Sequence, residues 1–157
     1  GPLEIACPVV LAPMTGVTDM PFRTLVRRFG SGLNVTEMIA SQAMIRETRQ
    51  SLQKAAWHMS EEPVSMQLAG CGPKEMAEAA KLNEDRGAAI IDINMGCPVK
   101  KVVNGDAGSA LMRAFGRWLA AECAVPSAVG PRRGTAGRAP LKRQRQGPDR
   151  SSPSAGA

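Results

Sequence analysis

The sequence predicts an α/β fold built on a parallel β-sheet. Short apolar runs of strand length alternate along the chain with longer stretches in which apolar residues recur at helical spacing. Strands that alternate with helices form right-handed βαβ units, in which neighbouring strands run parallel. The composition agrees with a globular domain, since 43% of the 157 residues are hydrophobic and 22% are charged.

The first strand–helix unit covers residues 9–30. Residues 9–14 form an apolar run that ends near Gly16, which is typical of a strand buried on both faces. Thr18 or Asp19 provides a side chain that can cap a helix. Four apolar residues then follow at the i, i+3, i+4, i+7 spacing of one helix face: Phe22, Leu25, Val26 and Phe29.

Three further strands are expected after this unit, at residues 33–38, 64–68 and 90–95. Helical stretches at residues 41–54 and 73–86 separate them. With the strand of the first unit, the sequence therefore predicts four strand positions in the sheet.

Each of the last two strands has an apolar face and a more polar face, because strand side chains alternate with a period of two. The apolar faces carry Val64, Met66, Leu68, Ile91, Ile93 and Met95. The opposite faces carry Ser65, Gln67, Ile90, Asp92 and Asn94. A barrel with helices outside and a site at the carboxyl ends of its strands fits this pattern. A doubly wound sheet is the alternative, since periodicity does not separate the two.

The chain divides near residue 113. Residues 1–113 contain 12 basic and 12 acidic side chains and 34 of the residues Ile, Leu, Val, Met and Phe, whereas residues 114–157 contain 8 basic, 2 acidic and only 5 such apolar side chains. A segment of that composition buries too little apolar surface to offset its ordering entropy. We therefore expect a domain at 1–113 and a disordered, basic, low-complexity tail at 114–157.

The sequence contains no signal for a membrane or a metal. It has no run of about 18 uncharged apolar residues and no secretory signal, so we expect a cytoplasmic protein without a membrane partner. Four cysteines and the single His58 show neither a CxxC pair nor close grouping, which argues against a zinc site or a disulfide framework.

Residues 92–101, Asp-Ile-Asn-Met-Gly-Cys-Pro-Val-Lys-Lys, carry the strongest chemical signal. Cys97 lies between Gly96 and Pro98 just past an expected strand, on a tight loop at the mouth of the sheet. Lys100 and Lys101 make its surroundings positive. Cys97 is therefore the candidate reactive residue, and a small buried hydrophobe is the alternative interpretation. Three acids are candidates for either acid–base chemistry or structural polar contacts: Glu37, Asp92 and Asp106.

Four segments together resemble the bacterial tRNA-dihydrouridine synthases. They are Ala-Pro-Met-Thr-Gly-Val-Thr-Asp-Met-Pro-Phe-Arg at 12–23, Thr-Glu-Met at 36–38, Gln-Leu-Ala-Gly at 67–70 and the 92–101 segment. They follow one another in the family's order and spacing, and the resemblance covers residues 3–113.

The resemblance implies a flavoenzyme with FMN at the mouth of a TIM-type barrel, which uses NADPH to reduce uridines of tRNA to 5,6-dihydrouridine. In such enzymes the flavin passes hydride to C6 of uracil and an acid protonates C5, and Cys97 has the position of that acid. A thiol is mostly protonated at neutral pH, which suits the role. The flavin supplies the redox step and the protein supplies placement.

The same resemblance assigns binding residues. Pro13, Met14, Thr15 and Gln67 match positions that contact the flavin ring, and Asn94 matches a position near the flavin and the target base. The Gln67 amide can donate and accept at the polar edge of the ring. Thr15 departs from the alanine common in the family, which a backbone contact would tolerate.

The resemblance ends near residue 113, and a (β/α)₈ barrel takes about 250 residues. We therefore expect the N-terminal half of a TIM-type barrel with an unpaired edge, which alone binds FMN weakly or not at all and is inactive. The later lysine and histidine, phosphate loops and tRNA-binding domain of the family are not recognisable. The tail resembles a GC-rich coding region read out of frame.

Two other functions remain open at the level of the sequence. One is an FMN barrel that reduces a free small molecule. The other is a non-enzymatic RNA-binding product whose tail neutralises phosphates. The basic residues of that tail that could neutralise phosphates are Arg132, Arg133, Arg138, Lys142, Arg143, Arg145 and Arg150.

Overall fold

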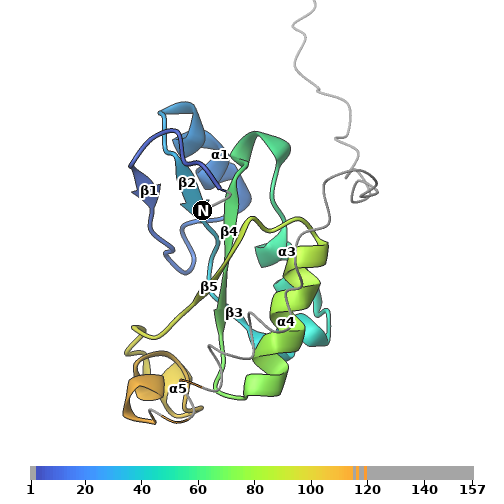
Figure 1. Cartoon of the computed structure of the whole chain (residues 1–157), viewed down its shortest axis with the longest axis vertical. Coiled ribbons are helices and arrows are strands. Elements are labelled where there is room, and N and C mark those ends of the chain that lie inside the picture. Colours follow the sequence, from blue (N-terminus) through green and yellow to red (C-terminus); the bar gives the residue numbers. More distant parts are fainter. Residues whose placement is uncertain (1–2, 115, 117–118, 120–157) are drawn as a thin grey trace, which may run out of the picture.

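The computed structural model describes residues 3–114, 116 and 119, and it contains one parallel sheet covered by helices (Figure 1). The five strands are β1 (Val10–Leu11), β2 (Leu33–Val35), β3 (Ile39–Ala40), β4 (Val64–Ala69) and β5 (Ile90–Ile93). Every strand pair is parallel. The predicted α/β class is confirmed. Nearly all of the predicted tail, 114–157, lies outside the described residues.

The order of the strands separates the two architectures that the sequence left open. β1 pairs with β2, β2 pairs with β4, and β5 pairs with the other edge of β4. Each new strand is thus added on the same side as the previous one, as in a barrel. A doubly wound sheet instead reverses direction, with its first strand in the interior. The doubly wound alternative is wrong.

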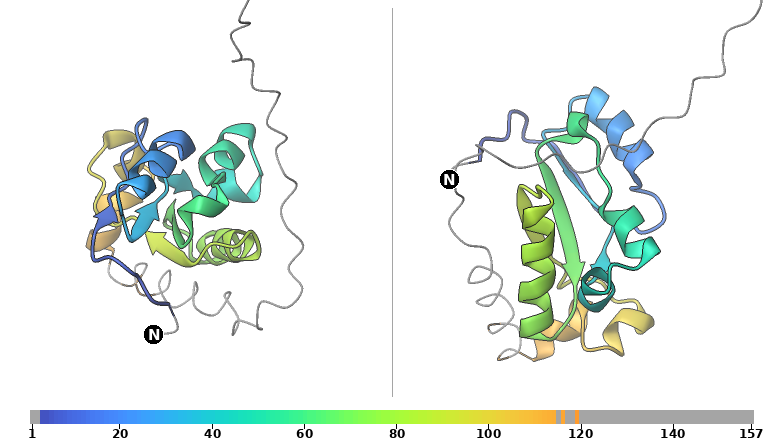
Figure 2. Two further views of the ribbon diagram at one scale, coloured as in Figure 1. Left: turned by 90° about the horizontal axis from the view of Figure 1, so that it is seen from above. Right: turned by 90° about the vertical axis from the view of Figure 1, so that its right-hand side faces the viewer.

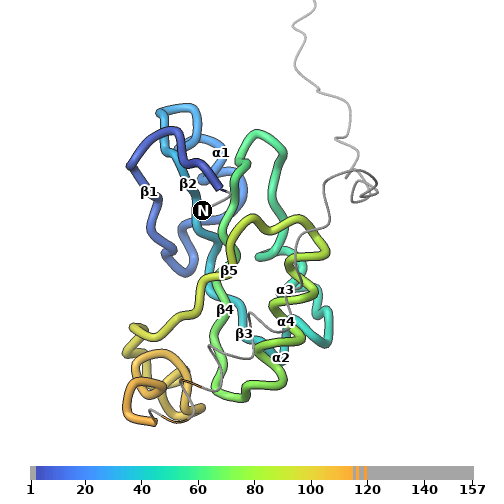
Figure 3. Tube along the Cα trace, in the orientation of Figure 1, coloured from blue at the N-terminus to red at the C-terminus, as the bar shows by residue number. Residues whose placement is uncertain are grey.

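The expected strand at residues 33–38 is interrupted. β2 pairs with the start of β4 and β3 pairs with its end, so the two short strands follow one another along one edge of β4 (Figure 3). Thr36 causes the interruption: its hydroxyl oxygen accepts from the Gln67 N–H at 3.1 Å, where a strand carbonyl would otherwise accept. The next residue, Glu37, forms an ion pair with Lys54.

The expected helix at residues 41–54 is also divided. The structure forms α2 (Ser41–Ile45) and α3 (Arg49–Ala55), with Glu47 at a positive φ of 49° between them. Thr48 caps α3, since its hydroxyl oxygen accepts from the Ser51 N–H at 3.1 Å. A side chain that caps the next helix competes with continuation of the previous one. The Thr48 cap therefore separates α3 from α2, although the apolar pattern alone predicts one continuous helix.

The other helices follow the sequence closely. α1 (Met20–Arg28) is capped by Asp19, whose carboxylate accepts from the Phe22 N–H at 3.0 Å, and α4 is Pro73–Asp85. Three short helices were not predicted: η1 (Met59–Glu61), α5 (Lys100–Val103) and η2 (Gly108–Arg113).

The core lies between the sheet and helices α2, α3 and α4 (Figure 2). Its buried members are Ile39, Met44, Ala55, Leu68, Met76, Ala79 and Ala80, with Ile91 and Ile93 packed against them. The predicted apolar faces of β4 and β5 therefore face the helices, and their polar faces lie on the other side. In β2 the polar Asn34 faces a helix instead, because its Nδ2 donates to the Arg23 carbonyl of α1 at 2.9 Å.

Candidate active site

The carboxyl ends of β4 and β5 hold the side chains that the sequence singled out. Gln67 Nε2 donates to Asp92 Oδ2 at 2.6 Å, and Asn94 Nδ2 donates to Gln67 Oε1 at 3.0 Å. Parallel register explains this meeting, since Gln67 is paired with Asp92. Three polar side chains from the inner face thus form one connected network.

The turn that carries Cys97 is attached to this network. Asn94 Oδ1 accepts from the backbone N–H of Gly96 at 3.3 Å and of Cys97 at 3.0 Å. The Cys97 side chain is half-buried. The structure therefore brings together Gln67, Asn94 and Cys97, three of the residues predicted to form the site.

A second contact closes the Cys97 turn from the η2 side. The Ser109 N–H donates to the Cys97 carbonyl at 2.9 Å. Gly108 has a φ of 59°, and a Cβ there would lie 2.5 Å from the Cys97 carbonyl oxygen, so glycine is required for this approach. The segment after β5 consequently folds back at the carboxyl ends of the strands (Figure 3). Lys100 and Lys101 are exposed in α5.

The Pro13–Met14–Thr15 segment follows β1 at the same end of the sheet, two strand positions from Gln67. Thr18 holds it in a tight turn: its fully buried hydroxyl accepts from the Met14 N–H at 3.0 Å and donates to the Met14 carbonyl at 3.2 Å. Met14 is 40% exposed, and Thr15 is exposed as well. The turn therefore presents a fixed backbone and an open surface.

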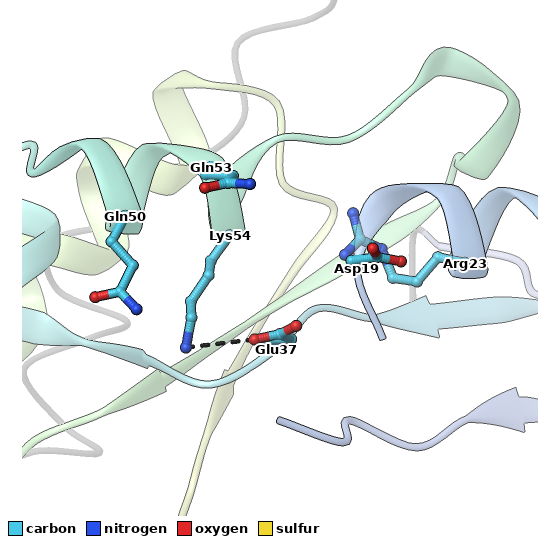
Figure 4. Close-up of a pocket in the computed structure, with 6 residues that line it drawn as sticks. All are labelled: Asp19, Arg23, Glu37, Gln50, Gln53 and Lys54. Atoms are coloured by element: carbon cyan, nitrogen blue, oxygen red, sulfur yellow. Dashed lines mark ion pairs between the residues drawn. The ribbon is translucent and has the colours of Figure 1, made fainter. Parts of the chain in front are cut away.

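A small polar pocket of about 170 Å³ lies beside the carboxyl ends of the strands, between α1 and α3 (Figure 4). Glu37 projects into it, and Lys54 Nζ lies 3.3 Å from Glu37 Oε2. The other lining residues are Asp19, Arg23, Gln50 and Gln53. Sequence reasoning named Glu37 but missed the α3 residues, whose only signal was the i, i+3, i+4 spacing of Gln50, Gln53 and Lys54.

Other residues considered from the sequence lie elsewhere in the fold. His58 is exposed, and its Nδ1 lies 2.8 Å from Ser60 Oγ and caps η1. Cys7 and Cys71 are half-buried free thiols. Within the described part of the chain, no three His, Cys, Asp or Glu side chains are grouped so as to hold a metal ion. No helix of those residues is long and apolar enough to cross a membrane.

The parallel sheet has the sequential strand order of an α/β-barrel type of protein, and the polar network lies at its carboxyl edge. The family model for "Dihydrouridine synthase (Dus)" matches residues 10–130. The chain belongs to the dihydrouridine synthase family, whose fold is a TIM-type barrel.

Curated relatives support the same placement. The chain is 63% identical over 115 residues to a "Probable tRNA-dihydrouridine synthase" of Rickettsia bellii, covering 72% of this chain and 35% of the relative. It is 55% identical over 113 residues to "tRNA-dihydrouridine synthase B" of Xanthomonas axonopodis pv. citri, covering 72% and 34%. The Pseudomonas aeruginosa protein of that name is 50% identical over 113 residues, with the same coverage. The chain thus spans about a third of the length of these relatives.

Proposed function

We propose that this chain carries the cysteine-bearing part of the active site of a tRNA-dihydrouridine synthase, which reduces uridine in tRNA to 5,6-dihydrouridine. The observation that carries the proposal is the bonded series from Gln67 through Asn94 to the Cys97 turn at the carboxyl edge of the sheet. The names of the relatives, tRNA-dihydrouridine synthases, support tRNA as the substrate over a free small molecule.

The residues fit a flavin mononucleotide by their chemistry. The exposed turn at Pro13–Met14–Thr15 offers a rigid surface for a flat ring, and the Gln67 amide retains one N–H and one oxygen lone pair beyond its bonds to Asp92 and Asn94. When bound, FMN supplies the hydride for the pyrimidine ring, with NADPH as the reductant. We assign these four residues to flavin binding.

The protein's own chemical step is a proton transfer. Cys97 Sγ holds the proton that C5 of uracil receives, on a turn fixed by Asn94 from one side and Ser109 from the other. Asn94 lies beside this turn and is assigned to the target base through the hydrogen that remains on its Nδ2. A fixed turn places the donor without loss of entropy at the moment of reaction.

A chimera tests the proposal. Residues 3–114 of this chain replace the corresponding segment of the Rickettsia bellii relative, and the chimera is expressed in bacteria whose own synthases have been deleted. We expect dihydrouridine to return to bulk tRNA, as measured by mass spectrometry of nucleosides. A chimera that leaves tRNA unmodified, while the intact relative modifies it, would contradict the function.

Matched cysteine variants of the chimera test the proton donor. C97A is expected to reduce dihydrouridine formation by at least about 100-fold, the usual scale for loss of a general acid. C71A removes another half-buried thiol and is expected to leave the level unchanged. Equal activity of C97A and C71A would remove the assignment of Cys97.

The 157-residue chain by itself is proposed to be inactive and to bind FMN weakly or not at all. Within the described residues, the inner sheet face is built from four strand positions, whereas a closed barrel surrounds its ligand with eight. Flavin absorbance at about one FMN per purified chain would contradict this expectation.

A further inference from the structure

Asp92 ends a chain of polar contacts whose direction can be established at both ends. A carboxylate can only accept hydrogen bonds, so the Gln67 group 2.6 Å from Asp92 Oδ2 must be its NH₂. At the other end, the backbone N–H groups of Gly96 and Cys97 can only donate, so the Asn94 atom that they contact must be its oxygen.

The middle contact agrees with both ends. Once Gln67 turns its nitrogen to Asp92, its oxygen faces Asn94, and Asn94 presents its nitrogen there at 3.0 Å. The orientation of the two amides is therefore determined by hydrogen-bond chemistry along the whole series of contacts from Asp92 through Gln67 and Asn94 to Cys97.

This orientation decides what remains for a ligand. Asn94 Oδ1 already accepts two hydrogen bonds, and Gln67 Oε1 accepts one. Each amide nitrogen keeps one hydrogen that is not used in this series of hydrogen bonds. The free groups are thus two N–H donors and a single lone pair, which suit a ring edge rich in acceptors such as carbonyl oxygens.

We propose that Asp92 is a positioning residue, whose carboxylate orients the Gln67 and Asn94 amides so that this site recognises the acceptor atoms of its ligand. Gln67 is 6% exposed, so a reversed amide would bury mismatched polar groups at a cost. The inference rests on the proposed function only in placing a ligand at this mouth.

Hydrogen exchange on the ¹⁵N-labelled 157-residue chain tests the role without flavin or tRNA, so its failure is distinguishable from failure of the proposed function. Asp92→Leu removes the acceptor, and Asp92→Asn keeps the shape and a neutral acceptor. We expect the Gln67 Nε2 hydrogen that bonds to Asp92 to exchange about tenfold faster in D92L, with D92N intermediate. Asp85→Leu, at an exposed acid near the end of α4, is the matched control and is expected to change neither.

Two backbone amides distinguish positioning from general support. The Cys97 N–H, which Asp92 does not touch, is expected to exchange several-fold faster in D92L. The Asn94 backbone N–H, which donates to the Leu68 carbonyl at 2.8 Å within the sheet, is expected to be unchanged. The proposal would be overturned if exchange at the Gln67 side chain and at the Cys97 N–H were unchanged. It would also be overturned if these two groups and the Asn94 backbone N–H were accelerated equally. If D92L does not fold, D92N decides by the same comparison between Gln67 and Asn94.

Discussion

Helices α1 and α4 are attached to the same sheet by different interactions. α4 is attached by apolar packing, since Met76, Ala79 and Ala80 are fully buried against β4 and β5. α1 has the clearer apolar stripe in the sequence, yet Leu25 is 49% exposed and Phe29 is 84% exposed.

Polar contacts attach α1 instead. Arg23 is 1% exposed, and its guanidinium donates to Glu61 at 2.6 Å and to the carbonyls of Thr18 and Ala56 at 2.8 and 2.7 Å. Asn34 of β2 adds a bond to the Arg23 carbonyl. The inner side of α1 is thus a buried polar cluster, and its apolar stripe faces away from the core.

The comparison shows that an apolar stripe indicates a surface to be covered without indicating which segment covers it. β1 is an edge strand of the described sheet, in which Val10 is 50% exposed, and Val9 just before it is 58% exposed. In a closed (β/α)₈ barrel the last unit packs on the first. The exposed flank at β1 and α1 is the position that this last unit occupies in such a barrel.

Glu61→Ala should cause the largest loss of stability, because it leaves the Arg23 charge buried without its partner. We expect the free energy of unfolding to fall by about 3–5 kcal/mol, as measured by urea denaturation. Glu62→Ala changes the exposed neighbouring acid and should shift it by less than about 0.5 kcal/mol. Equal effects of the two variants would show that the polar cluster does not hold α1.

Met76→Ala tests the apolar attachment of α4. It empties a fully buried position and is expected to cost about 2–5 kcal/mol, measured in the same way. Met112→Ala removes a methionine that is 63% exposed and should cost under about 0.5 kcal/mol. A small effect of Met76→Ala would mean that α4 is not attached through its apolar face.

Most of the fold could be predicted from the sequence, because strand and helix periods were clear. The class and the facing of β4 and β5 are confirmed, and of the two candidate caps for α1, Thr18 and Asp19, the structure uses Asp19. The break at Glu47 was missed because the apolar spacing does not reveal the Thr48 cap that begins α3. The break at Thr36 was missed because it depends on a side-chain bond to another element, β4. The buried Arg23–Glu61 pair was missed for the same reason: its partners are 38 residues apart.

The candidate site was predictable in part. Spacing after the strands placed Gln67, Asn94 and Cys97 at one edge, and parallel pairing brings these three together. The Gln67–Asp92 contact requires the register between β4 and β5, which the sequence alone does not determine. The roles assigned to Pro13, Met14, Thr15, Gln67, Asn94 and Cys97 remain predictions.

Thr18→Val addresses the turn that joins β1 to α1. It leaves the Met14 N–H without its buried acceptor, and we expect a loss of about 1–3 kcal/mol in the free energy of unfolding. Thr15→Val alters an exposed hydroxyl in the same turn and is the control, with an expected change below about 0.5 kcal/mol. If both variants unfold alike, the Thr18 hydroxyl does not maintain the turn.

Leu25→Ser with Phe29→Ser should have the smallest effect on stability, although it removes two large apolar side chains from a helical stripe. Phe29 is largely exposed and Leu25 is about half exposed, so the free energy of unfolding is expected to change by less than about 0.5 kcal/mol per site. Self-association, measured by sedimentation velocity, should decrease more than in Met112→Ser, because an uncovered apolar flank promotes association. A loss of stability approaching that of Met76→Ala would mean that the stripe is already covered within this chain, and the contrast between α1 and α4 would then disappear.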